Sequence, residues 1–202
     1  MMAPSYSTHA EDVAFVERYR NGDKTAFKSL LDKHLGSVYA FVFQLTRDRA
    51  AAEDIAQETF IKAWRHLGRY DVARPFRTWL FAIAKNTAYD WLKKKRSIPF
   101  SAFVDVADGG IPFENIPDPE PLPTEFLMRA DASAELAEVI RQLPEKYRSL
   151  IALVYHEGFS LHEAAEVLGE SYNTVKSRHQ RGILELRKHL KNAPKTGENR
   201  TI

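Results

Sequence analysis

Cysteine is absent from this 202-residue chain. Its absence excludes disulfide bonds, thiol catalysis and cysteine-ligated metal sites, and it fits a protein of the reducing cytoplasm. Long apolar runs are missing too: runs such as Val38–Phe43 stop at six residues, far short of the roughly 18 that a membrane-spanning helix needs. The polar N-terminus, Met1–Ala10, lacks the features of a signal peptide. We therefore expect no stable membrane insertion.

Net charge is also small, because 29 basic and 27 acidic side chains leave only +2 when histidine is neutral. Partners must therefore be inferred from where the charges gather. Between Ser97 and Met128 lie six acids, no lysine or arginine, and six of the ten prolines. Acidic, proline-rich sequence of this kind is typical of an extended linker. We predict an acidic linker over 97–129, domains at 8–96 and 130–191, and flexible tails at 1–7 and 192–202.

Apolar side chains recur at helical spacing on both sides of this linker, and no segment of useful length alternates as a strand does. In the first domain the pattern predicts four helices, the second capped by Asp23 and the fourth starting at Pro75. The apolar, core-facing side of the second includes Leu35, and that of the third includes Trp64. In the second domain it predicts helices at 125–142, 144–156, 160–168 and 172–191, with the last helix packed through Val175 and Ile183 on Ala164, Ala165, Val167 and Leu168. The predicted fold class is therefore all-α, with a four-helix bundle and a smaller helical domain.

The last two predicted helices have the pattern of a helix-turn-helix. Ser160 and Glu163 match a capping box, and Gly169 is a stop signal three residues before the final helix. The final helix carries six cations against one acid, with short polar residues near its start. Short polar, Arg and Gln side chains at this end of a recognition helix read base edges, while cations hold phosphates. We predict DNA binding here, in preference to a merely solvated basic helix.

A second set of cations lies among aromatic side chains near the end of the first domain. Aromatic rings stack on unpaired bases and cations neutralise phosphates, so this pattern favours single-stranded nucleic acid as the ligand. The alternative is that the rings fill the core, and it weighs more for Trp91 than for Trp79. The set comprises Arg69, Arg74, Arg77, Lys85, Lys93, Lys94, Lys95 and Arg96 with Tyr70, Phe76, Trp79, Tyr89 and Trp91.

Catalytic and metal-binding signatures are weak. His162, Glu163 and Glu166 imitate part of the H-E-x-x-H zinc motif, but its fifth position is glutamate and Glu163 already has a capping role. The other histidines show no ligand spacing, and there is no glycine-rich phosphate loop or nucleophile elbow. We expect no catalytic residue, no metal and no cofactor, and therefore no enzyme.

Several stretches of the chain resemble bacterial sigma factors. Residues 52–64 (AEDIAQETFIKAW) and 76–88 (FRTWLFAIAKNTA) are similar to sigma region two. Residues 143–148 (LPEKYR), 166–169 (EVLG) and 174–178 (TVKSR) are similar to region four. Two domains without further regions match the extracytoplasmic-function (ECF) type, over about residues 11–96 and 130–191. The chain departs from the family at Tyr172-Asn173, where small residues are common, and at Gly182 inside the recognition helix.

This resemblance implies a subunit that binds core RNA polymerase and directs promoter recognition, promoter melting and transcription initiation. Its core-binding helix would present a stripe at i, i+3, i+4 and i+7 toward the beta-prime clamp helices, while region four would contact the beta flap. Ordinary helix solubility is the alternative explanation of such a stripe. The four residues are Asp54, Gln57, Glu58 and Ile61.

The resemblance also implies two DNA-binding sets. Loop 69–75 and the helix after it would hold the minus-ten element, with Asn86 beside the pocket that captures a flipped base. The minus-ten set is Arg69, Tyr70, Arg77, Trp79, Lys85, Asn86, Tyr89 and Lys93. The minus-thirty-five set is Thr174, Lys176, Ser177, Arg178, Gln180 and Arg181. Within it, Arg178 is expected at a phosphate and Lys176, Ser177, Gln180 and Arg181 at base edges.

Further partners follow from the family. Besides core polymerase and promoter DNA, it implies an anti-sigma factor and a place in the bacterial cytoplasm, where the anti-sigma factor would sequester the chain at the membrane. The acidic linker would thread a basic channel of the polymerase, or would simply be kept soluble by its acids.

A stand-alone helix-turn-helix regulator is the alternative function, but it needs neither the stripe nor the aromatic-basic set. A nucleic-acid-processing enzyme would need clustered acids near the basic sets, and none are found there.

Overall fold

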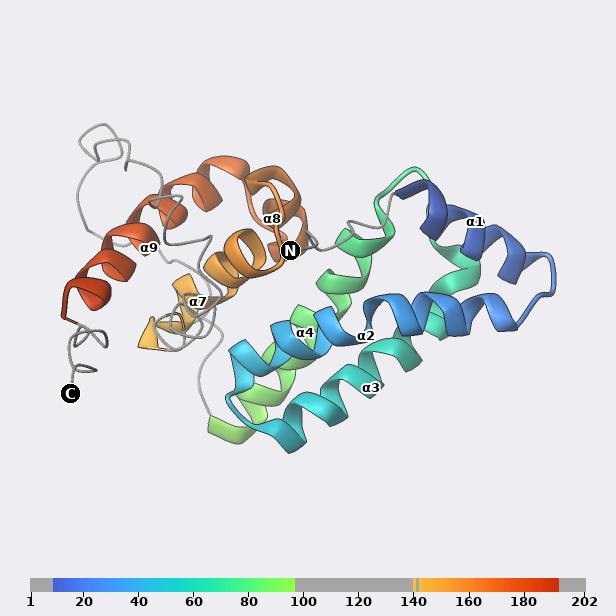
Figure 1. Ribbon diagram of the computed structural model, residues 1–202, viewed down its shortest axis with the longest axis horizontal. Coiled ribbons are helices and arrows are strands. Elements are labelled where there is room, and N and C mark those ends of the chain that lie inside the picture. Colours follow the sequence, from blue (N-terminus) through green and yellow to red (C-terminus); the bar gives the residue numbers. More distant parts are fainter. Residues whose placement is uncertain (1–8, 97–139, 141, 193–202) are drawn as a thin grey trace, which may run out of the picture.

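A computed structural model describes residues 9–96, 140 and 142–192 (Figure 1). Every regular element in these ranges is helical, which confirms the predicted all-α fold. The N-terminal unit consists of α1 (His9–Arg20), α2 (Thr25–Thr46), α3 (Arg49–His66), the 3-10 turn η1 (Leu67–Arg69) and α4 (Phe76–Arg96). The C-terminal unit consists of α7 (Glu145–Ile151), the π-helical turn η4 (Ala152–His156), α8 (Leu161–Leu168) and α9 (Tyr172–Asn192).

Capping residues set the ends of the N-terminal helices. The Asp23 carboxylate accepts the Thr25 N–H at 3.0 Å, at the predicted start of α2. α2 ends at Arg47, which adopts a left-handed conformation with φ of 57°. α3 begins directly after Asp48, whose carboxylate accepts the Ala51 N–H at 3.2 Å. This last cap was not predicted from the sequence.

The core of the N-terminal unit forms from the apolar faces of α2, α3 and α4. Phe41, Phe76 and Phe81 are among its largest fully buried side chains, and the rings of Phe41 and Phe81 lie 5.3 Å apart. Complete burial of a phenylalanine stabilises a fold by about 1.5–3 kcal/mol. α2 packs against both α3 and α4, so this one helix organises the bundle.

The C-terminal unit confirms the predicted helix-turn-helix. The Glu163 N–H donates to Ser160 Oγ at 3.2 Å and the Ser160 N–H donates to Glu163 Oε2 at 2.8 Å, completing the capping box of α8. Gly169 ends α8 with φ of 72°, a left-handed conformation that glycine adopts without strain. α9 begins at Tyr172, where the recognition helix was expected.

The helix predicted over 144–156 changes character in its second half. α7 is α-helical only to Ile151, and η4 continues it with wider bonds such as Glu157 N–H to Ala152 O at 3.0 Å. Turns of this π type are frequent at functional positions. Here the turn leads into Glu157 and Phe159, which both contact the N-terminal unit.

Gly182 explains how α9 packs on α7. A Cβ atom at this position would lie 3.3 Å from the Ile151 side chain and 3.5 Å from Tyr147 Cβ. The close approach of the two helices offsets the roughly 1 kcal/mol by which glycine disfavours a helix relative to alanine. Ile183 packs in the same apolar cluster as these α7 residues, although the sequence predicted that it would pack on α8. Val175 does pack in one cluster with Ala164 of α8, as predicted.

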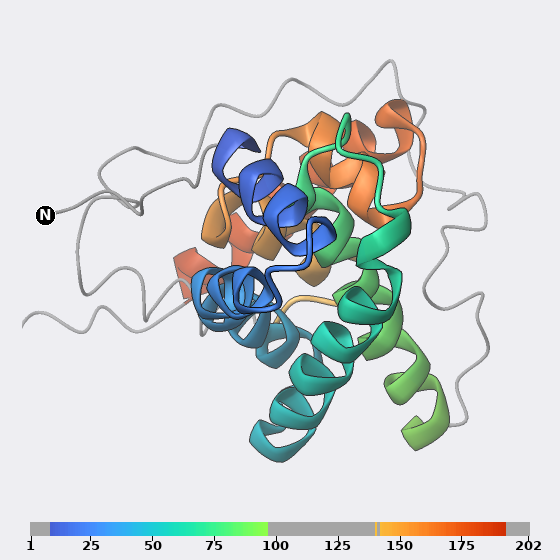
Figure 2. The ribbon, with the colours of Figure 1, turned by 90° about the vertical axis from the view of Figure 1, so that its right-hand side faces the viewer.

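The two units pack directly against each other. α4 lies against α8, and α2 lies against α7 and η4 (Figures 1 and 2). The ring of Phe81 in α4 is 5.0 Å from that of Phe159, within one apolar cluster that runs through both units. We call this junction the seam. Its polar residues are Arg77, Lys85 and Tyr89 of α4 and Arg148, Ser149 and Glu157 of the C-terminal unit.

The predicted linker (97–129), the tails (1–7 and 192–202, apart from Asn192) and most of the helix predicted over 125–142 lie outside the described residues. The domain boundaries set by those segments stay predictions. Within the ranges that the structure describes, no helix is long and apolar enough to cross a bilayer. In the same ranges, no group of three acidic or histidine side chains is placed to hold a metal ion.

Candidate functional site

The predicted stripe on α3 is exposed along its whole length. Asp54, Gln57, Glu58 and Ile61 all face solvent, as their i, i+3, i+4, i+7 spacing requires. Glu58 forms an ion pair with Lys62 at 2.8 Å one turn on. Exposed helical pairs of this kind contribute only about 0.3–0.5 kcal/mol, so a partner can displace the lysine. The stripe offers that partner two carboxylates, an amide and an apolar side chain.

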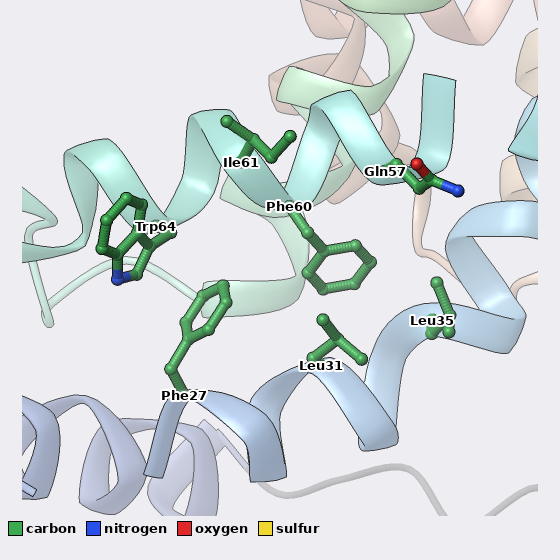
Figure 3. A pocket seen from close by; sticks show the side chains of 7 residues that line it. All are labelled: Phe27, Leu31, Leu35, Gln57, Phe60, Ile61 and Trp64. Atoms are coloured by element: carbon green, nitrogen blue, oxygen red, sulfur yellow. The ribbon is translucent and has the colours of Figure 1, made fainter. Parts of the chain in front are cut away.

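An apolar groove of about 460 Å³ runs between α2 and α3 beside this stripe (Figure 3). In the close view, Phe27 and Leu31 of α2 point toward Phe60 and Trp64 of α3. Gln57 and Ile61 belong to both the stripe and the groove, so the two form one continuous surface. The lining residues are Phe27, Leu31, Leu35, Gln57, Phe60, Ile61 and Trp64.

Two groove residues were expected in the core and are not there. Trp64 is 51% exposed and Leu35 is 39% exposed, and Ile61 beside them is 48% exposed. Large apolar side chains left exposed together mark a binding surface. Helical spacing placed Leu35 and Trp64 on apolar faces correctly, but spacing does not show whether a neighbouring helix covers that face.

Tyr70, a member of the predicted minus-ten set, is part of the core. The residue is 4% exposed, and its ring lies 4.9 Å from that of Trp79 and 5.5 Å from that of Phe76. Its hydroxyl donates to Arg74 O, which closes the loop at 69–75 onto α4. Burial raises the pKa of Tyr70 to about 12, so the phenol stays neutral.

Part of the predicted minus-ten set remains on the surface. Arg69, Asn86 and Lys93 are exposed, and Trp79 is half-buried against Tyr70 and Phe76. Trp91 packs against the core, the alternative favoured for it. The accessible part of the set therefore lies on the loop before α4 and along one side of that helix.

Arg77 faces the seam and is occupied there. Its Nη2 atom lies 2.9 Å from Glu157 Oε2 and also donates to the Glu157 carbonyl. The guanidinium stacks over the Phe159 ring at 4.1 Å and lies 5.2 Å from the Phe81 ring. Glu157 is 5% exposed, and its other oxygen, Oε1, lies 2.9 Å from His156 Nδ1. Hydrogen bonding to Glu157 raises the pKa of His156.

Lys85 and Tyr89 of the predicted set are also held at the seam. Lys85 Nζ donates to Leu168 O, the carbonyl at the end of α8, at 3.1 Å. Burial lowers the pKa of Lys85. The Tyr89 hydroxyl donates to Ser149 Oγ at 3.0 Å, and burial raises the pKa of this tyrosine. In this arrangement, Arg77, Lys85 and Tyr89 are all half-buried and bonded to the C-terminal unit.

The minus-thirty-five set is partly accessible on α9. Thr174, Lys176, Ser177 and Arg181 are half-buried. Ser171 caps the helix by accepting the Thr174 N–H at 3.1 Å, and Ser177 Oγ donates to Thr174 O at 3.0 Å. Lys176 and Arg181 are therefore the cations of the set that the fold leaves nearest to solvent.

Arg178 and Gln180, two of the predicted DNA contacts, are buried in this structure. Arg178 is 2% exposed and Gln180 is 7% exposed. Arg178 Nη1 donates to Glu170 Oε1 at 2.8 Å, and Nη2 lies 2.8 Å from Oε2. A cation paired inside the domain does not neutralise a phosphate, so Arg178 here ties α9 to the turn before it.

Two aromatic pairs of the helix-turn-helix had no signal in the sequence. His162 and Tyr172 stack with centroids 4.1 Å apart and planes 19° from parallel, joining the starts of α8 and α9. Tyr155 and His179 stack at 5.7 Å and share a hydrogen bond of 3.1 Å. Burial lowers the pKa of His179. Periodicity within one helix cannot reveal pairs formed between two helices.

Both halves of the chain match known families. Residues 30–98 match sigma-70 region 2, and residues 133–186 match sigma-70 region 4. Together with the helix-turn-helix, these matches define a sigma factor, the class of subunit that gives RNA polymerase its promoter specificity.

Similar proteins of known family show which type of sigma factor this chain is. The chain is 33% identical over 177 residues to the ECF RNA polymerase sigma factor SigW of Bacillus subtilis, covering 87% of this chain and 95% of SigW. It is 34% identical over 176 residues to the RNA polymerase sigma-H factor of Pseudomonas aeruginosa, covering 85% and 89% of the two chains. The chain belongs to the family of ECF RNA polymerase sigma factors, which confirms the resemblance found in its sequence. The alternative of a stand-alone regulator is not favoured, because both relatives match across both units.

Solved structures share the fold. CnrH, in complex with the cytosolic domain of CnrY, is similar with a TM-score of 0.65 and 25% identity, over 91% of this chain and 99% of CnrH. RpoE of Bartonella quintana, in complex with the anti-sigma factor NepR, is similar with a TM-score of 0.61 and 26% identity, over 84% and 99%.

Proposed function

We propose that the α3 stripe and the apolar groove form the surface through which this sigma factor binds the beta-prime clamp helices of core RNA polymerase. The observation that carries the proposal is that Gln57 and Ile61 border both features. An amphipathic helix laid along this surface would bury apolar side chains in the groove and place cations beside Asp54 and Glu58. Apolar burial would supply affinity, and the charges would set orientation.

Replacing Asp54 and Gln57 together by alanine tests this proposal. Both side chains are exposed, so the fold should persist while core affinity falls about tenfold, equivalent to ~1.4 kcal/mol. Glu17→Ala with Asn21→Ala is the matched control, since it also removes one exposed carboxylate and one exposed amide, but on α1 and the turn after it. Fluorescence anisotropy would measure the Kd for core polymerase, and circular dichroism the helicity. Wild-type affinity with intact helicity would contradict the clamp assignment.

We propose that DNA is bound by two surfaces. Arg69, Trp79, Asn86 and Lys93 would contact the minus-ten element, because they are the accessible cations, amide and aromatic ring of the predicted set. Lys176 and Arg181 would lead the contacts to the minus-thirty-five element, with Thr174 and Ser177 beside them. The beta flap would bind the C-terminal unit, as the family resemblance implies.

We also propose an anti-sigma factor as a partner, acting in the bacterial cytoplasm. Support comes from a similar structure, that of the sigma factor RpoE in complex with the anti-sigma factor NepR. CnrH, the other similar structure, is likewise in complex with a second protein, the cytosolic domain of CnrY. The apolar groove suits an amphipathic helix from either partner, so an anti-sigma factor and core polymerase would compete for it. A membrane-held anti-sigma factor would then keep the chain at the membrane.

Ile61→Glu tests this competition, because it puts a charge into the groove at an exposed position. The variant should lose both core binding and retention in the membrane fraction. Retention by the membrane with core binding lost would contradict a shared groove.

A further inference from the structure

Local hydrogen bonds shape the loop between η1 and α4. Asp71 Oδ1 accepts the Ala73 N–H at 3.0 Å, and the Arg74 N–H donates to Asp71 O at 3.1 Å. The Tyr70 hydroxyl donates to Arg74 O. Each of these bonds joins residues at most four positions apart, so together they close the loop on itself. The direction in which the loop leaves η1 depends on contacts with other segments.

Arg20, the last residue of α1, provides such a contact at the entry to the loop. Its Nη2 atom donates to Tyr70 O and, at 3.4 Å, to Leu67 O, which lie 50 and 47 positions later in the chain. α1 thus reaches the segment that links α3 to α4 (Figure 1). Tyr70 O belongs to the peptide group that joins Tyr70 to Asp71, where the backbone becomes extended. A nitrogen bonded to both carbonyls fixes the plane of that peptide group, and with it the direction of the loop.

Other side chains already attach α1 to the bundle. Asp12 is buried, and its Oδ1 atom lies 3.1 Å from Nε2 of the buried His34 in α2. Val16, one turn further along α1, is fully buried in the core. Arg20 itself is exposed, and replacing an exposed side chain usually changes the free energy of unfolding little. The bonds from Arg20 therefore serve the loop more than they serve the fold.

We propose that Arg20 is a positioning residue for this loop, so that α1, which belongs to neither predicted DNA-binding set, helps to set base selectivity in the minus-ten element. The loop lies between Arg69 and Trp79, and the inference rests on the minus-ten role proposed for them. A loop ordered before DNA arrives loses no conformational freedom on binding, so the base that fits it binds most tightly. A loop that moves adapts to several bases, and the difference between their affinities falls.

A direct contact between Arg20 and a DNA phosphate is the alternative explanation. Phosphate contacts carry no sequence information, so losing one weakens binding to all promoter sequences alike. Loss of a positioned loop instead changes the preference among bases at one place in the promoter. Base preference therefore separates the two roles. It is a ratio between promoters measured with one protein, so a smaller amount of folded protein cancels from it.

Arg20→Met is the informative variant, because it keeps a long apolar side chain and removes the donors. Its matched control is Arg18→Met, which removes an exposed arginine from the same helix, where its partner is Asp23 at 2.6 Å and not the loop. Each full chain is assembled with core polymerase on a promoter found by mapping transcript ends. The promoter is made with each of the four bases at every minus-ten and minus-thirty-five position. The yield of the first short transcripts measures promoter opening.

We expect Arg20→Met to reduce the preference for the best base at one minus-ten position about tenfold. Preferences in the minus-thirty-five element should stay as in wild type, and Arg18→Met should keep all wild-type preferences. Unchanged preferences in Arg20→Met, an equal loss of transcript from every promoter version, or the same change in Arg18→Met would each overturn the positioning role. In those cases wild type still selects bases, so the proposed function stands. A wild-type chain with no preference at any minus-ten position would overturn the minus-ten role itself, and this inference with it.

Discussion

Arg178 in α9 reaches back across the turn of the helix-turn-helix to Glu170, eight residues earlier, with both of its terminal nitrogens 2.8 Å from a carboxylate oxygen. Arg178 is 2% exposed, and its side chain has no route to a phosphate in this arrangement. The pair fixes the start of the recognition helix relative to α8. Arg178, which the sequence predicts at a phosphate, thus has a structural role within the domain.

Arg178→Ala and Arg181→Ala should consequently have different effects. Arg178→Ala leaves Glu170 without its partner and should lower the free energy of unfolding by about 3 kcal/mol. Arg181→Ala should instead reduce discrimination between matched and scrambled minus-thirty-five elements by ~1–3 kcal/mol. Urea unfolding and DNA titrations would measure the two effects. Equal loss of stability in both variants would show that the division of roles is wrong.

Glycine-to-alanine changes at two helical positions should differ because of packing. At Gly36 in α2, a Cβ atom would meet nothing within 4 Å, so Gly36→Ala should stabilise the protein by about 0.5–1 kcal/mol. Gly182→Ala would bring its Cβ 3.3 Å from Ile151, so overpacking should cancel that gain or reverse it. Thermal unfolding of both variants measures the difference. An equal rise in Tm for the two would contradict the close approach of α7 and α9.

Tyr70 should contribute a pH-dependent part of the stability. Its folded pKa, raised by burial to about 12, exceeds the ordinary value of 10.0. The neutral form is thus favoured on folding, and this contribution is fully present below pH 10 and is lost as the pH rises toward 12. Tyr70→Phe removes this contribution and the hydroxyl bond to Arg74 O, costing about 0.5–1.5 kcal/mol near neutral pH. Unfolding curves from pH 8 to pH 11 should show a flatter alkaline decline for the variant; parallel declines would be the contrary result.

Asn86→Ala should impair promoter opening more than closed-complex binding. The amide is exposed on α4 at the family position beside the base-capturing pocket, and losing one such contact costs ~1–3 kcal/mol. A pre-melted minus-ten bubble removes the cost of unpairing but not the need for base capture, so it should rescue the variant only in part. Permanganate reactivity of minus-ten thymines measures opening, with Asp90→Ala as the control on the same helix. If the Asn86→Ala variant opens duplex DNA as well as wild type does, Asn86 has no role in base capture and is an ordinary surface residue.

Much of the fold was predictable because its signals are local. The capping box at Ser160 and the stop at Gly169 depend on residues within one turn of the chain, and both formed as expected. The stripe from Asp54 to Ile61 was also predictable, since spacing within one helix determines which side chains share a face.

The functional surfaces were less predictable because they depend on contacts between distant segments. Nothing near Arg77 in the sequence indicates that Glu157, 80 positions later, neutralises it. The exposure of two aromatic residues was also not predictable from the sequence. Tyr70 was expected on the surface and is buried, whereas Trp64 was expected in the core and is exposed. Residue type and periodicity describe what a side chain can do, whereas packing between units decides whether it is available.

The most direct test of the central claim is in vitro transcription from sheared genomic DNA of the source bacterium by core RNA polymerase, with and without this chain, followed by sequencing of the transcript ends. We predict that the full chain directs initiation at discrete start sites that share two elements, near minus-ten and minus-thirty-five. With the variant carrying Asp54→Ala and Gln57→Ala, the start sites should be those that core polymerase uses alone. Start sites that are the same with and without the wild-type chain would contradict its role as a promoter-specificity subunit.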